Sequence, residues 1–115
     1  MVDVLESEAR LEALRRTSLL DSPPEETFDR LTRLATTVLR VPVALVSLVD
    51  SDRQFFKSQS GLSEPLASIR QTPLARSFCK HAVGSREPLI VPDARRDPLF
   101  EDSTTVLGED GPIAY

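Results

Sequence analysis

The sequence predicts an α+β domain in which helices cover a largely antiparallel sheet. Two stretches with apolar residues at helical spacing come first, Glu6–Leu20 and Pro23–Arg40. An almost unbroken apolar run, Val43–Val49, then leads through a polar loop into Gln54–Ser58, and this pattern predicts a β-hairpin. A third helix and another short apolar run follow, so the order is helix, helix, hairpin, helix, strand.

The first predicted helix places Leu11, Leu14, Ser18 and Leu19 on one stripe. Glu12 precedes Arg16 by four residues, the spacing of an attractive pair. Two interpretations remain open for it. The stripe packs on its own domain, or it pairs with a second copy of the chain.

The second predicted helix begins at a capping signal. Ser22 is followed three residues later by Glu25, as in a capping box, and Pro23 suits the first helical position. The pair Val41–Pro42 ends the helix, because a residue before proline is pushed out of helical geometry. The helix is expected to cover the core without carrying chemistry. The residues predicted to face inward are Phe28, Leu31, Ala35, Val38 and Leu39. The residues predicted to face outward are Asp29, Arg30, Thr32, Arg33 and Thr36.

The run Val43–Val49 barely alternates, which predicts a strand covered on both faces near the middle of the sheet. After the hairpin, Ser60–Pro73 is a long connection of the kind that is often functional. Pro73–Val83 is predicted as a helix with Leu74, Ala75, Phe78, Cys79 and Ala82 inward. Pro88–Pro92 is predicted as a second buried strand, and a polar turn is predicted from Asp93. Ile113–Tyr115 is predicted as the start of a third strand.

Composition bounds the class of protein. A chain of 115 residues holds one domain, and a net charge of -4 without a long basic run gives no support to nucleic-acid binding. Cys79 is the only cysteine, which excludes an intrachain disulfide and favours a reducing, cytoplasmic setting. The first residues are charged and do not predict a signal peptide, and the apolar runs are too short to span a membrane.

Three blocks of the sequence resemble a known family of domains. The blocks FDRLTRLATTVLRVPVALVSLVDSDRQFFKS, SFCKHAV and PLIVPDARRDPLF resemble GAF domains at the front of bacterial sensor kinases and diguanylate cyclases. The resemblance implies a lead-in or dimerisation helix at residues 1–20 and a GAF-like domain at 21–115. It also implies that the chain covers the N-terminal two-thirds of such a domain, ending before its last strands.

No catalytic group is expected. Cys79 and His81 lie two residues apart, which on one helix places them about 200° apart, so they share neither a proton nor a metal ion. The family's methionine sulfoxide reductase depends on several cysteines, and this chain has one. Members that attach a bilin through a second cysteine have Asp-x-Cys-Phe where this chain has Asp97-Pro98-Leu99-Phe100, so a covalently bound chromophore is not implied.

The resemblance implies a sensory or regulatory module that binds a small molecule or partner and passes its state to an output domain. The ligand is left open, and a homodimer is expected. Two alternatives remain: a dimerisation module without ligand, and a fragment of a larger signalling enzyme. The residues expected at the rim of a ligand pocket are Phe56, Lys57, Ser58, Ser77, Phe78, His81, Asp93, Arg96 and Asp97.

Overall fold

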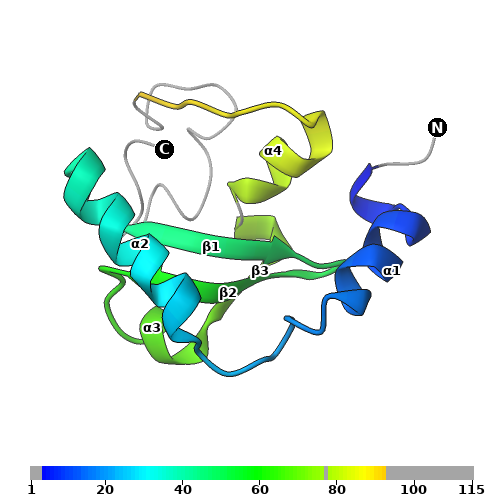
Figure 1. Cartoon of the computed structure of the whole chain (residues 1–115). Helices are drawn as coiled ribbons and strands as arrows, with labels where there is room; N and C mark the ends of the chain where they lie inside the picture. Colours follow the sequence, from blue (N-terminus) through cyan, green and yellow to red (C-terminus); the bar gives the residue numbers. More distant parts are fainter. Residues whose placement is uncertain (1–3, 77, 93–115) are drawn as a thin grey trace.

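The computed structural model describes residues 4–76 and 78–92. Its helices and strands follow in this order: η1 (Val4–Glu6), α1 (Glu8–Arg16), α2 (Glu26–Leu39), β1 (Ala44–Val49), β2 (Arg53–Ser60), α3 (Leu66–Ile69), β3 (Gln71–Pro73), η2 (Leu74–Arg76) and α4 (Cys79–Ser85). The strands form an antiparallel sheet in the order β1-β2-β3 (Figure 1). The predicted α+β class with an antiparallel sheet is therefore confirmed.

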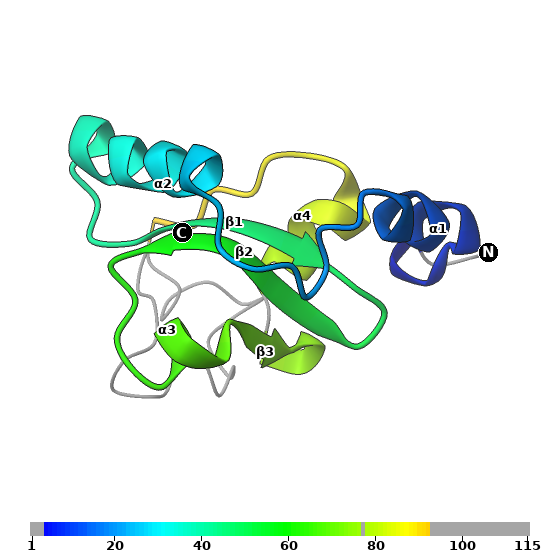
Figure 2. The same cartoon turned by 60° about the horizontal axis from the view of Figure 1, so that its bottom comes forward.

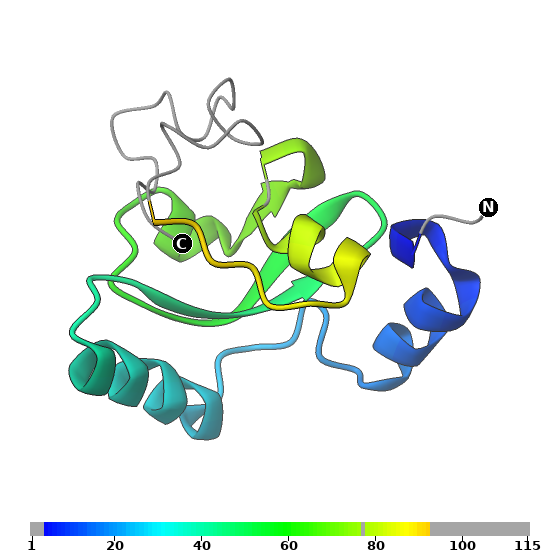
Figure 3. The ribbon, with the colours of Figure 1, turned by 90° about the horizontal axis from the view of Figure 1, so that it is seen from above.

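Helices lie on both sides of the hairpin. Helix α2 packs along β1 and β2, and α4 lies at the end of the hairpin, where it contacts β1 and η1 (Figure 3). The short α3 lies on the side of the strands away from α2 (Figure 2). Helix α1 sits at the turn end of the hairpin, where the Arg10 guanidinium donates to the carbonyl of Val49 at 2.6 Å.

The middle strand of the described sheet is β2 and not β1, which corrects the prediction for Val43–Val49. Residues Gln54–Ser58 are all buried, whereas β1 is half-buried except at Val49. The error has a physical cause. Apolar content marked β1 as the covered strand, but β2 buries polar groups whose hydrogen bonds are satisfied inside the fold.

A β-bulge interrupts the hairpin. Val46 pairs with Ser58 and the next residue, Ser47, pairs with Phe56, so Lys57 has no partner opposite it. A bulge of this kind bends the strand and re-aims the side chain of the extra residue. The bulge therefore falls on the most buried side chain of the strand.

Both N-terminal helices differ in detail from the predictions. Helix α1 ends at Arg16, earlier than expected, because Ser18 adopts a positive φ of 58°. Leu11 is buried against the domain, while Glu12 forms the expected pair with Arg16 at 3.5 Å. Helix α2 begins at Glu26, so the predicted capping box at Ser22 is wrong, and Glu25 occupies the N-cap without a side-chain hydrogen bond.

The predicted apolar face of α2 is only partly inward. Phe28 and Ala35 are half-buried, but the exposed residues include Leu31, Leu34, Val38 and Leu39. Thr32, expected outside, is buried at 2% exposure because its hydroxyl lies 3.0 Å from that of Ser58. A polar contact thus decides which side of α2 faces the sheet.

The segment after the hairpin is more structured than its sequence suggested. The expected loop Ser60–Pro73 contains α3 and β3, and the expected helix Pro73–Val83 is divided into η2 and α4. Residues Leu89–Val91 form no strand, although Val91 is buried against Phe78. The predicted turn from Asp93 and the predicted strand Ile113–Tyr115 lie outside the described residues.

Two glycines give a matched test of this fold. Gly61 has φ +93°, and a Cβ there would lie 1.9 Å from the carbonyl oxygen of Pro42, whereas a Cβ at Gly84 in α4 would meet nothing within 4 Å. Gly61→Ala should lower the free energy of unfolding by roughly 2–4 kcal/mol through strain and overlap. Gly84→Ala should raise it by about 0.5–1 kcal/mol because alanine favours the helix. Urea denaturation measures both, and equal effects would contradict the backbone path at Gly61.

Candidate functional site

A fully buried lysine is the centre of the site. The Lys57 side chain has 0% exposure, and its ammonium donates to the Ser22 hydroxyl at 2.7 Å and the Pro23 carbonyl at 2.8 Å. It also forms an ion pair with Glu25, and it lies 5.4 Å from the centre of the Phe28 ring. A buried ammonium is tolerated only when its donors are satisfied, and here three acceptors serve three protons.

All three acceptors come from one segment, Asp21–Glu25, which we call the strap and which joins α1 to α2. Arg70 holds the same segment by donating to the carbonyl of Ser22 at 3.0 Å, and it also donates to the carbonyl of Lys57 at 3.1 Å. Two cations that are 13 residues apart in sequence therefore fix one stretch of backbone. The strap contains two consecutive prolines, which restrict its conformation.

A third cation holds the start of the strap. The Arg53 guanidinium forms a bidentate ion pair with the Asp21 carboxylate, with hydrogen bonds of 2.7 and 2.8 Å. Its Nε donates to the Asp50 carboxylate at 3.2 Å. Arg53 and Arg70 also lie 5.7 and 5.0 Å from the centre of the Phe55 ring. The hydrogen bonds from Arg53 lower the pKa of Asp21 below its ordinary value of 3.8, and the carboxylates of Asp21 and Asp50 raise the pKa of Arg53.

A cleft of about 300 Å³, which we call the Lys57 cleft, opens beside the strap. At one wall the Ser58 hydroxyl donates to the Asp29 carboxylate at 2.6 Å, so α2 contributes a polar contact and not only cover. The residues lining it are Pro24, Asp29, Arg33, Phe56, Lys57, Ser58, Gln59, Ser60, Ala67 and Arg70. The cleft thus brings together α2, β2 and the segment around α3.

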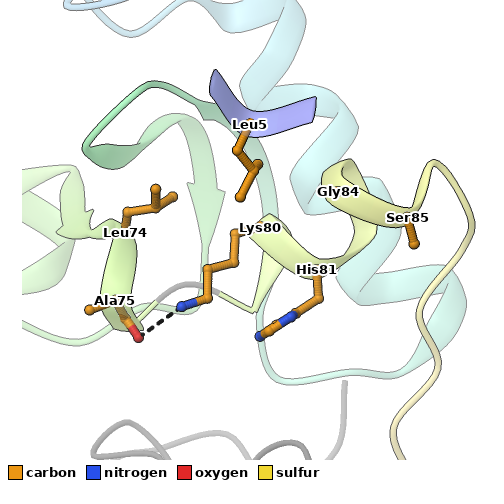
Figure 4. Close-up of a pocket in the computed structure, with 7 residues that line it drawn as sticks. All are labelled: Leu5, Leu74, Ala75, Lys80, His81, Gly84 and Ser85. Carbon is orange, nitrogen blue, oxygen red and sulfur yellow. Dashed lines mark hydrogen bonds between the residues drawn. The ribbon is translucent and has the colours of Figure 1, made fainter. Parts of the chain in front are cut away.

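A second pocket, of about 660 Å³, lies beside α4 (Figure 4). It is lined by Leu5, Leu74, Ala75, Lys80, His81, Gly84 and Ser85. The Lys80 ammonium reaches across to the carbonyl of Ala75 at 3.3 Å. Burial, followed by the neighbouring charge of Lys80, lowers the pKa of His81 below its ordinary value of 6.5.

The structure distributes the predicted rim residues over separate places. Phe56, Lys57 and Ser58 line the Lys57 cleft, whereas His81 lines the pocket beside α4. Phe78 lines neither of these two pockets and packs in the core. The remaining predicted residues lie outside the described part of the chain: Ser77, Asp93, Arg96 and Asp97.

Sequence reasoning missed the residues that surround Lys57. Ser22 and Glu25 have the spacing of a local cap, and Arg70 lies in a stretch that the sequence predicts as a loop, where no pattern marks it. Cys79 and His81 were expected to face different surroundings. The Cys79 sulfur lies 3.3 Å from the Gln54 amide on β2, while His81 lines the pocket beside α4.

Within residues 4–76 and 78–92, no group of three His, Cys, Asp or Glu side chains is placed to hold a metal ion. None of the described helices has the length and apolar content needed to cross a membrane.

The antiparallel hairpin with helices on both sides defines the class of domain, and comparison with known proteins gives the family. The model of the GAF domain matches residues 23–115, and the chain belongs to this family. The chain is also 38% identical, over 91 residues, to a cyclic di-GMP phosphodiesterase of Pseudomonas aeruginosa. That match covers 79% of this chain but 15% of the relative, so the chain spans a small part of that protein's length.

The pair between Arg53 and Asp21 predicts a pH dependence of stability. Because the pKa of Asp21 is lowered in the fold, its stabilising effect is complete above 3.8 and is lost as the pH falls through the lowered value. Asp21→Asn should therefore destabilise the protein near neutral pH and should flatten the loss of stability in acid. Thermal melts between pH 2 and 7 test this, with Asp52→Asn, on an exposed carboxylate in the hairpin loop, as the matched control. Parallel pH profiles for wild type and Asp21→Asn would contradict the assignment.

Proposed function

We propose that this GAF domain is a sensory or regulatory module of bacterial signal transduction, without catalysis of its own. Membership of the family supports a regulatory role, and the relative is a phosphodiesterase in which most of the sequence lies outside the match. An output domain in the same protein would then carry the activity, and this chain would set its level. The proposal includes a small-molecule ligand bound in the Lys57 cleft.

One observation carries the proposal: the cleft and the strap share the same side chains. Lys57 and Arg70 line the cleft, and both hold the strap. A ligand that repositions either cation must change how firmly Ser22 and Pro23 are held. Because the strap connects α1 to α2, a change in the cleft reaches the N-terminal helix directly.

The mechanism is a shift between two arrangements of the strap, held and released. A ligand shifts such an equilibrium only to the extent that it binds one arrangement better than the other. The contacts of Lys57 differ between the two arrangements, since its acceptors belong to the strap. The energetic link between the cleft and α1 is then a coupling free energy of the kind that defines allosteric regulation.

Lys57→Met tests the coupling. The substitution keeps side-chain length but removes all three contacts with the strap, including the part-buried hydrogen bond to the Pro23 carbonyl. We expect a loss of about 1–3 kcal/mol in unfolding free energy. We also expect amide exchange at Ser22, whose N–H donates to the Leu19 carbonyl, to speed up at least tenfold, with a several-fold change in the output activity of the whole natural protein.

Two further variants keep this test decisive. Ser22→Ala weakens the strap without burying an unpaired charge, and Arg30→Gln changes an exposed residue of α2 that does not line the cleft. Faster exchange in the strap with unchanged output in both Lys57→Met and Ser22→Ala would refute the regulatory role.

A further inference from the structure

The residues that line the Lys57 cleft carry more positive than negative charge, and the carboxylates that pair with two of its cations, Glu25 and Glu26, lie outside that lining. The lining residues include three cations, Arg33, Lys57 and Arg70, and one carboxylate, Asp29, whereas the whole chain carries a net charge of -4. Such a local excess of positive charge attracts anions to a concave site. The cleft is therefore suited to an anionic ligand and not to a cationic one.

The three cations differ in how firmly their charges are compensated. Arg70 donates hydrogen bonds to two neutral carbonyl oxygens, those of Ser22 and Lys57. Arg33 pairs with Glu26, and both side chains are more than half exposed, so this pair is held weakly. Lys57 is fully buried, but the Glu25 carboxylate that pairs with it is 52% exposed and can turn to water.

The beginning of α2 lies next to the cleft, and its first turn also carries the acidic side chains of Glu26 and Asp29. Glu25 is its N-cap residue, and its side chain makes no capping hydrogen bond to the first turn of this 14-residue helix. The first amides of a helix carry partial positive charge and bind phosphate oxygens. Pro24 and Asp29, on either side of these amides in sequence, both line the cleft.

We propose, on the basis of the function proposed above, that the Lys57 cleft binds a small organic phosphate that replaces the Glu25 carboxylate at Lys57. Guanidinium groups and an ammonium give charge-assisted hydrogen bonds to several phosphate oxygens at once. A volume of about 300 Å³ is at the lower end for small-molecule sites, which limits the ligand to one phosphate with a small organic body. Phe56 is also one of the residues that line the cleft.

The replacement has a consequence for the strap. Glu25 is one of the three acceptors that Lys57 takes from the strap, so a bound phosphate reduces the hold of Lys57 on that segment. Reciprocally, a variant that has already lost the Glu25 carboxylate should bind phosphate more tightly. This increase distinguishes replacement from binding beside an intact ion pair.

The experiment is a titration of the ¹⁵N-labelled protein with inorganic phosphate and with phenyl phosphate, followed by amide chemical shifts. Sodium chloride at matched ionic strength is the control for charge screening. We expect saturable shifts at Phe56–Ser60 and Arg70, with tighter binding of phenyl phosphate. Arg33→Gln should weaken binding at least fivefold, while Arg30→Gln, the same change on the same helix outside the cleft, should leave it unchanged.

Glu25→Gln should tighten phosphate binding at least threefold, and Glu12→Gln on α1, which removes the same charge away from the cleft, should not. Absence of saturable shifts, or equal affinity in Arg33→Gln and wild type, overturns the phosphate site. Unchanged affinity in Glu25→Gln overturns the replacement. If no phosphate binds but Lys57→Met still alters output, the proposed function stands and the ligand class falls. If phosphate binds but strap variants leave output unchanged, the proposed function falls.

Discussion

The need to satisfy one buried ammonium organises this domain. Lys57 lies on the most buried strand without any exposed surface, and an ammonium in that position requires three good acceptors. The bulge at Lys57 aims the side chain, and the strap supplies Ser22, Pro23 and Glu25 to meet it. The route of the chain from α1 to α2 is therefore set by a residue that follows both helices in the sequence.

The same principle explains how polar β2 becomes the middle strand. Gln54 donates to the hydroxyl of Ser47, and Ser58 lies in a chain of contacts with Asp29 and Thr32 of α2. Each buried polar group thus has a partner on a different element. Such contacts fix how the layers align, because a shift by one residue would leave several polar groups buried and unpaired. Apolar packing alone would tolerate more than one alignment.

The sequence predicted the parts of the fold that depend on local pattern. The hairpin at Val43–Ser58, the end of α2 near Arg40 and the α+β class follow from runs, polar loops and proline positions, and all are present. The polar centre could not be predicted in this way. Ser22 and Glu25 have the spacing of a local cap, yet their partner lies 35 residues from Ser22, and nothing in a local pattern separates these two uses. The strand predicted at Pro88–Pro92 was wrong for a related reason, because a strand exists only where another strand pairs with it.

The strap also shows why regulation and stability need not conflict in this domain. Lys57 is held by two neutral acceptors, Ser22 and Pro23, and by one charged acceptor, Glu25, which is half exposed. The neutral acceptors keep the ammonium hydrogen-bonded whether or not Glu25 is engaged. Exchange of one carboxylate for another anion then leaves no buried charge unpaired, so the cost of switching remains small. Lys57 holds the strap between α1 and α2, and only one of its acceptors, the Glu25 carboxylate, has to be exchanged. The strap can therefore change its arrangement while the sheet stays folded.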